Sequence, residues 1–272
     1  MIRYHVEGKV GVVTIDRPEK RNAMTYAMLG DFIETVGRAD DDPATTVLLI
    51  TGVPGAFCAG TDLADLATVP GEVRGLRGEA DERHKWWPIA QARKPTIGAI
   101  DGPAVGLGAE FSSQCDLRLA STQARFAWNF VHRGLVPDTG AGTWLLPRIV
   151  GLQPALRLLY TGEMIDAAEA LRLGYVLDVV PSEDLLGGAR HLAQTNAPGS
   201  PHSHRLVQWH DNTRRNTPLG VHMAPPPPPH AACCKIVDRY SRRRAPTDSS
   251  VLGVDSRLST APIGHSDVDR LR

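Results

Sequence analysis

The sequence predicts an α/β fold in which most strands pair in parallel. Short apolar runs alternate along the chain with longer segments whose apolar residues recur at helical spacing. Turns that contain glycine or proline separate the two kinds of segment. Alternation of strands and helices favours parallel pairing, because each helix carries the chain back to the starting edge of the sheet. No internal repeat is visible in the 272 residues.

Five apolar runs have the length and composition of buried strands. The first is closed by Asp16, Arg17 and Pro18, and the second ends at Gly52. The expected strands are residues 11–15, 46–51, 96–100, 117–120 and 175–180.

Two segments between these strands are expected to be helical. Thr25 predicts an N-cap, because its hydroxyl can accept a hydrogen bond from the first helical turn. That helix is expected to run toward Arg38. Its apolar face consists of Met28, Phe32, Ile33 and Val36. The second segment, residues 71–93, is mostly polar and stops before Pro95.

The character of the chain changes at residue 200. Residues 200–272 contain 11 Lys and Arg against six Asp, with no Glu and no Phe, and they include five consecutive prolines, 225–229. Such a proline run continues neither a helix nor a central strand. We therefore expect residues 1–199 to form a globular body. Residues 200–272 are expected to be a poorly ordered tail, and a change of reading frame near residues 200–230 would explain its composition.

Charge and composition exclude several classes of protein. The whole chain has 30 Lys and Arg against 30 Asp and Glu, so it lacks the basic excess of a nucleic-acid binder. It has neither an apolar run of about 20 residues nor an apolar N-terminal segment, so membrane insertion and secretion are not expected. Cys58, Cys115, Cys233 and Cys234 lack the spacing of a metal site. We expect a cytoplasmic protein with reduced thiols and no metal.

Two glycine-containing turns, residues 55–63 and 102–110, each follow a predicted strand. A helix that begins after such a turn leaves its first N–H groups without acceptors. If the turns face each other, they aim two N–H donors at one oxygen, which is the requirement of an oxyanion hole. The same pattern also fits ordinary strand-to-helix turns, and it matches neither the phosphate-binding nor the dinucleotide motif.

Several motifs, in a fixed order, carry a family resemblance. They are residues 17–24, 57–63, 101–118, 134–138, 142–148 and 161–176. Over about residues 3–199 the chain resembles the crotonase (enoyl-CoA hydratase/isomerase) superfamily. The resemblance implies a spiral of ββα units that binds a coenzyme A thioester, usually as trimers or hexamers, with no separate cofactor. The residues 134–138, Gly-Leu-Val-Pro-Asp, most resemble the isomerase branch of the family.

The resemblance also implies roles for individual residues. The backbone N–H groups of Thr61 and Leu107 would form the oxyanion hole, and Glu110 and Asp138 would move protons. Phe130 stands where hydratases of the family carry a second glutamate, and it can neither accept nor donate a proton. The stretch from Asp138 to Thr143 contains one residue more than the family pattern, near Gly142. Enoyl-CoA isomerase chemistry is therefore favoured, and a hydratase that works with Glu110 alone is the alternative.

Two further sets of residues would contact the substrate. The coenzyme A group would be bound by Lys20, Arg21, Ala59, Asp62 and Leu63, and the acyl pocket would be lined by Trp128, Phe130 and His132. Arg17 is a further candidate for the coenzyme A phosphates. Asp62 has an alternative, purely structural role in fixing its loop.

Two rival functions remain open from the sequence. A Clp-type serine peptidase has a related fold, and here it would depend on Ser112 or Ser113 together with His132. However, Glu110 occupies the critical position after the second turn. The other rival is a non-catalytic acyl-CoA-binding relative, which the unusual tail favours.

Overall fold

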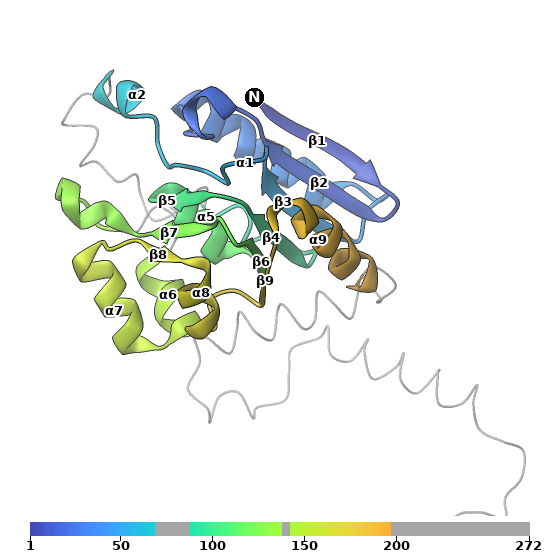
Figure 1. The fold of residues 1–272 in the computed structure, drawn as a ribbon. Coiled ribbons are helices and arrows are strands. Elements are labelled where there is room, and N and C mark those ends of the chain that lie inside the picture. Colours follow the sequence, from blue (N-terminus) through green and yellow to red (C-terminus); the bar gives the residue numbers. More distant parts are fainter. Residues whose placement is uncertain (69–86, 138–141, 197–272) are drawn as a thin grey trace, which may run out of the picture. The chain divides into compact units, whose positions relative to one another are not determined.

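The computed structural model describes residues 1–68, 87–137 and 142–196, which are coloured in Figure 1. In this part of the chain the strands form a six-stranded sheet of order β1-β2-β3-β4-β6-β9 and a three-stranded sheet of order β5-β7-β8. The large sheet consists of β1 (Ile2–Glu7), β2 (Val10–Ile15), β3 (Val47–Gly52), β4 (Thr96–Ile100), β6 (Leu117–Ser121) and β9 (Asp178–Val180). The small sheet consists of β5 (Pro103–Val105), β7 (Arg125–Ala127) and β8 (Ile165–Asp166).

The predicted α/β class and parallel pairing are confirmed. Every neighbouring pair of the large sheet from β2 to β9 is parallel, and only β1 is antiparallel, to β2. The sequence did not predict β1, β5, β7 or β8. These strands are short or half exposed, so their apolar patterns are weak.

The predicted strand over residues 175–180 is only half correct. β9 begins at Asp178, because Tyr175 and Val176 end a helix instead of joining the sheet. The N–H groups of Tyr175 and Val176 both donate to the carbonyl oxygen of Ala170 (2.8 and 3.4 Å), in the last turn of α8. A run of apolar residues cannot by itself distinguish this capping segment from a strand.

The helices cover both faces of the large sheet. They are α1 (Tyr26–Asp41), α2 (Leu63–Thr68), α5 (Leu107–Gln114), α6 (Gly142–Val150), α7 (Leu152–Thr161), α8 (Ala167–Arg172) and α9 (Ser182–Asn196), with short 3₁₀ helices η1 (Pro18–Lys20) and η3 (Asn129–Arg133). Alternate residues of β3 point to opposite faces: Val47 and Leu49 pack with α9, whereas Leu48 and Ile50 belong to the larger core that includes α1 and α5. Figure 1 shows α9 lying across the sheet.

The two predicted helices have different outcomes. The Thr25 hydroxyl accepts a hydrogen bond from the Met28 N–H (3.2 Å), so the predicted cap of α1 is confirmed. On the predicted apolar face of α1, Phe32 and Val36 are buried, and Met28 and Ile33 are partly buried. Of residues 71–93, residues 71–86 lie outside the described part, and residues 87–93 form turns rather than a helix. Here the Ile89 N–H donates a hydrogen bond to the side-chain oxygen of Gln114 in α5 (3.2 Å). This side-chain acceptor takes the place of a backbone carbonyl within a helix.

The last described element is α9, which ends at Asn196. The predicted boundary between residues 199 and 200, and the whole predicted tail, therefore lie outside the described residues. Among the helices that are described, none is both long enough and apolar enough to cross a bilayer.

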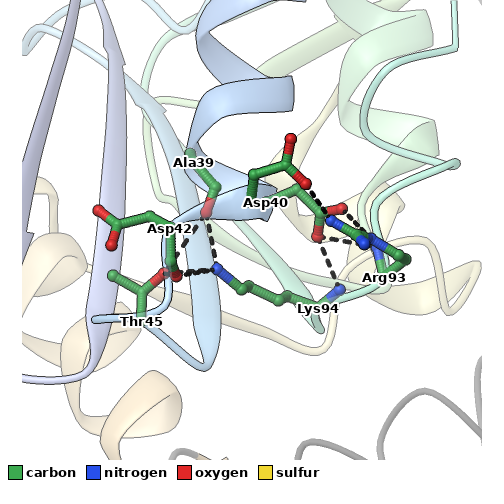
Figure 2. A network of polar contacts seen from close by, with 7 residues as sticks. Ala39, Asp40, Asp42, Thr45, Arg93 and Lys94 are labelled. Carbon is green, nitrogen blue, oxygen red and sulfur yellow. Dashed lines mark hydrogen bonds and ion pairs between the residues drawn. The ribbon is translucent and has the colours of Figure 1, made fainter.

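Lys94 ties the end of α1 to the start of β4 (Figure 2). Its ammonium group donates to the carbonyl oxygens of Ala39 (2.8 Å) and Asp42 (2.6 Å) and to the Thr45 hydroxyl (2.9 Å). A cation at this position complements the partial negative charge at a helix C-terminus. Burial lowers the pKa of Lys94, and the carboxylates of Asp40 and Asp42 act in the opposite direction. The neighbouring Arg93 forms ion pairs with Asp40 (2.8 Å) and Asp41 at a more exposed position.

Replacing Lys94 with methionine is expected to lower the free energy of unfolding by about 2 kcal/mol, because three acceptors lose a charged donor. Urea denaturation measures this change. The matched control is Arg93→Met, whose exposed ion pairs contribute less than about 1 kcal/mol. Equal losses for the two variants would contradict the anchoring role of Lys94.

Candidate functional site

Three loops at the carboxyl ends of neighbouring strands lie side by side. Because β2, β3 and β4 run in the same direction, the loops that follow them leave the sheet at the same edge. These loops are residues 16–25, 53–62 and 101–106. The first two pair through their backbones: the Met24 N–H donates to the Gly60 carbonyl oxygen (2.8 Å), and the Asp62 N–H donates to the Met24 carbonyl oxygen (2.7 Å).

The two glycine turns start in the second and third of these loops and continue into α2 and α5. The two loops also pair directly. The Cys58 N–H donates to the carbonyl oxygen of Pro103 (3.0 Å), and the Val105 N–H donates to the carbonyl oxygen of Cys58 (3.0 Å). The two turns therefore face each other, an arrangement that the sequence analysis left open. The three loops together form one continuous layer of paired backbone at this edge of the sheet.

Glycine is required where the two turns approach each other. A Cβ atom on Gly108 would lie 2.0 Å from the carbonyl oxygen of Cys58, and one on Gly102 would lie 2.2 Å from that of Gly55. Gly102 also has a φ of +59°, a region that favours glycine. The glycines thus permit one backbone to touch another.

The N–H groups of Thr61 and Leu107 lie on adjacent segments of this layer. A Cβ atom on Gly60, next to Thr61, would lie 3.8 Å from the amide nitrogen of Leu107. Leu107 is the first residue of α5, so its N–H has no acceptor within the helix. Neither N–H donates a hydrogen bond to any of the residues that the structure describes. Two backbone donors therefore remain available at the point where the turns meet.

Glu110 lies one turn into α5 and is fully buried. Its Oε1 accepts a hydrogen bond from the Gly142 N–H (3.3 Å), at the start of α6. A Cβ atom on Gly142 would lie only 2.7 Å from the same oxygen. The glycine therefore leaves room for the carboxylate. The other predicted acid–base residue, Asp138, lies outside the described residues.

Ser112 and Ser113 of α5 belong to a buried polar cluster. The Tyr175 hydroxyl forms hydrogen bonds with the hydroxyls of Ser112 (2.6 Å) and Ser113 (3.0 Å), and both serines donate to the carbonyl oxygen of Ala109 (2.8 and 2.9 Å). His132 is exposed and contacts the Thr161 carbonyl oxygen (2.7 Å) instead. Within the described part of the chain, no histidine contacts either serine, so the arrangement that a serine peptidase requires is missing.

The three predicted acyl-pocket residues occupy different environments. Phe130 is partly buried, and its ring lies 4.0 Å from the position of a Cβ atom on Gly106, in the second turn. Trp128 is completely buried, with its ring edge-on to Tyr175 at 5.1 Å. His132 points to the C-terminus of α7. Of the three, only Phe130 lies beside the paired turns by these contacts.

The predicted coenzyme A residues lie on the first two loops. Lys20 and Arg21 are exposed, and the Arg21 carbonyl oxygen accepts a hydrogen bond from the Ala59 N–H (3.0 Å). The side chain of Leu63, at the start of α2, is half exposed. These residues present a positive and partly apolar surface next to the turns.

Asp62 has internal partners. It forms an ion pair with Arg17 (2.7 Å), and its Oδ1 accepts a hydrogen bond from the Ala64 N–H (2.9 Å). The Arg17 guanidinium, followed by the Ala64 N–H, holds the pKa of Asp62 below its usual range. Arg17 also donates to the Ala23 carbonyl oxygen (3.0 Å). These contacts agree with the structural role considered for Asp62. They also occupy the guanidinium group of Arg17, which was a candidate for the coenzyme A phosphates.

Asn22 is a site residue to which sequence reasoning assigned no role. It is fully buried, accepts a hydrogen bond from the Arg17 N–H (2.8 Å) and donates to the carbonyl oxygen of Ala56 (2.7 Å). It thereby joins the first loop to the second. Its position in a polar stretch gives no local sign of burial.

Among the described residues, His, Cys, Asp and Glu side chains form no group of three that would suit a metal ion.

Comparison with known sequences identifies one family. The sequence model of enoyl-CoA hydratase/isomerase matches residues 5–219. The short-chain-enoyl-CoA hydratase of Clostridium acetobutylicum is 36% identical over 199 residues, which cover 71% of this chain and 74% of that protein.

Solved structures agree with the sequence match. An enoyl-CoA hydratase subunit from Geobacillus kaustophilus superimposes with a TM-score of 0.78 at 28% identity, covering 90% of this chain and 96% of that one. A monofunctional enoyl-CoA isomerase from M. smegmatis gives a TM-score of 0.70 at 26% identity, covering 83% and 99%. Similar proteins therefore include both hydratases and an isomerase.

Proposed function

Because the chain belongs to the enoyl-CoA hydratase/isomerase family and has its crotonase-like fold, we propose that it moves a double bond in an enoyl-CoA thioester. The family membership makes it an enzyme of acyl-CoA metabolism. The choice of isomerisation rests on one observation: the site contains the buried carboxylate of Glu110, whereas an apolar ring, Phe130, lies beside the second turn.

In this proposal the thioester oxygen accepts hydrogen bonds from the N–H groups of Thr61 and Leu107. The support is their position on adjacent, directly paired segments and their lack of acceptors among the described residues. Backbone donors held by a rigid layer stabilise negative charge without having to reorganise during the reaction. An enolate is therefore the intermediate that this arrangement favours.

Glu110 is proposed as the proton carrier. Its carboxylate removes a proton from C2 of a 3-enoyl-CoA, and the electron pair moves onto the thioester oxygen as a dienolate. Return of a proton at C4 places the double bond between C2 and C3 and restores the carboxylate. Asp138 is proposed as the second acid–base group on the strength of the family resemblance. The reaction moves only protons, so the proposal includes no metal ion or redox cofactor.

Substrate binding completes the proposal. Lys20 and Arg21 are proposed to bind the coenzyme A phosphates, because both are exposed beside the paired turns. Leu63 is proposed to lie near the adenine, and Ala59 to contact the coenzyme A group. Asp62 would act on the same surface indirectly, through its ion pair with Arg17. Phe130 is the proposed wall of the acyl pocket, with Trp128 and His132 as more distant members. Assembly into trimers or hexamers is expected from the resemblance.

A hydratase that uses Glu110 alone is the second candidate. The observation in its favour is the similarity to the Clostridium acetobutylicum short-chain-enoyl-CoA hydratase. Hydration also needs an activated water, and hydratases of the family are expected to use a second carboxylate where Phe130 stands.

Product analysis separates these functions. The purified full-length chain is incubated with 3-enoyl-CoA and, separately, with 2-enoyl-CoA, and the products are examined by mass spectrometry and by the absorbance of the conjugated thioester. We expect 3-enoyl-CoA to become 2-enoyl-CoA without a change of mass. A gain of one water from 2-enoyl-CoA would favour the hydratase instead. Coenzyme A binding by a folded protein that yields neither product would support the non-catalytic alternative.

A further inference from the structure

Asp101 connects the first glycine turn to the second. It lies between β4 and the second turn, and its Oδ2 accepts a hydrogen bond from the N–H of Gly55, in the first turn (2.7 Å). The residue that follows it, Gly102, touches the carbonyl oxygen of the same Gly55 so closely that a Cβ atom would lie 2.2 Å from it. The side chain of Asp101 thus spans the place where the two turns meet.

The other carboxylate oxygen of Asp101 is held by two hydroxyl groups from other elements. Oδ1 accepts hydrogen bonds from Ser121, at the end of β6 (2.5 Å), and from Ser182, at the start of α9 (3.0 Å). Burial acts to raise the pKa of Asp101, but the hydrogen bonds from Ser121, Gly55 and Ser182 outweigh it, so the pKa lies below the usual range. Two donors fix the rotation of the carboxylate and aim the remaining oxygen at the first turn.

We infer that Asp101 is a positioning residue that sets the separation of the two backbone donors, Thr61 and Leu107. The inference rests on the proposed function, since it concerns the oxyanion hole of that proposal. Thr61 follows Gly55 by six residues, and Leu107 follows Asp101 by six residues. A clamp at the beginning of both segments, together with the backbone pairing at Cys58, restricts how far their ends can move apart.

Asp116 provides a matched control at the opposite end of the same strands. Its Oδ2 accepts hydrogen bonds from the N–H and the hydroxyl of Thr96 (both 2.8 Å) and so joins the start of β6 to the start of β4. Asp101 is partly buried and Asp116 is exposed, and each carboxylate ties β4 to its surroundings. The difference is that Asp116 lies away from the glycine turns, so its loss weakens the sheet without touching the oxyanion donors.

The test compares Asp101→Ala with Asp116→Ala in the full-length protein, using the coenzyme A thioester of 4-dimethylaminocinnamic acid. The absorption of this enoyl thioester moves to longer wavelength when its carbonyl oxygen accepts hydrogen bonds, so the shift reports on the donors directly. We expect Asp101→Ala to lose most of the shift shown by the unchanged protein, and Asp116→Ala to keep it. We also expect Asp101→Ala to lower kcat by roughly 100-fold, with KM close to that of the unchanged protein.

Each outcome has a distinct meaning. If the unchanged protein binds the thioester without any shift, the proposed oxyanion hole is wrong, and the role of Asp101 fails with it. If the unchanged protein gives the shift and Asp101→Ala keeps it, or if Asp116→Ala loses it equally, only the positioning role is overturned. Should Asp101→Ala not fold, Asp101→Asn retains the shape and weakens the hydrogen bonds. It is expected to give an intermediate shift, and an unchanged shift would overturn the inference.

Discussion

Replacing Glu110 with glutamine is expected to lower kcat by about 10²- to 10⁴-fold, the range that a positioned general base contributes. Glutamine has the same shape as glutamate, and its carbonyl oxygen can still accept the hydrogen bond from the Gly142 N–H. The fold and the affinity for coenzyme A should therefore remain. The measurement is the rate of isomerisation of 3-enoyl-CoA under saturating substrate, with coenzyme A binding measured in parallel by calorimetry.

Gly142→Ala is the companion variant, because it displaces the carboxylate of Glu110 without removing it. Its Cβ atom would lie 2.7 Å from Oε1 and 3.1 Å from the carbonyl oxygen of Pro137, so the flexible glutamate side chain has to move. We expect an intermediate loss of kcat, since small misplacements of a reacting group are costly. Full activity in Glu110→Gln would remove Glu110 from the mechanism and leave Asp138 as the candidate base.

Gly108→Ala is expected to destabilise the protein by more than about 3 kcal/mol, at or above the upper end of the usual cost of overpacking. The added Cβ atom would lie 2.0 Å from the carbonyl oxygen of Cys58, and a backbone atom cannot rotate away as a side chain can. Relief of this clash requires the two turns to separate, which breaks the hydrogen bonds between Cys58 and its partners Pro103 and Val105. Urea denaturation followed by circular dichroism measures the loss.

The control for this prediction is Gly37→Ala, on the exposed face of α1. A Cβ atom on Gly37 meets nothing within 4 Å, so the same chemical change adds helix propensity without a clash. It is expected to stabilise the protein by about 0.5–1 kcal/mol. A Gly108→Ala variant as stable as the unchanged protein would mean that the two turns are not in contact in solution.

Much of the fold follows from patterns that are local in sequence. Threonine at position 25 caps α1, and the apolar residues that follow it at helical spacing become its buried face. The runs that became β2, β3, β4 and β6 are strongly apolar and end at turn residues. Where the same type of pattern was wrong, at Tyr175 and Val176, the apolar residues were buried as predicted but their N–H groups capped α8.

The features of the candidate site also divide into those that local sequence reveals and those that it does not. The two glycine turns are visible in the sequence, because small residues after a strand are a local signal. Glu110 was assigned from the family resemblance. The roles of Asn22 and Asp101 are not visible in the sequence, since each depends on an acceptor or donor more than 30 residues away. A hydrogen bond across such a separation leaves no periodic trace in the sequence.

Local sequence thus determined where the chain turns and which segments become strands. Tertiary structure alone decided that the turn after β3 pairs with the turn after β4, that Arg17 is committed to Asp62, and that His132 contacts Thr161 rather than a serine. The physical reason is that propensities, caps and turns act between residues close together along the chain. Backbone pairing between loops, by contrast, arises only after parallel strands have brought their carboxyl ends to one edge of the sheet.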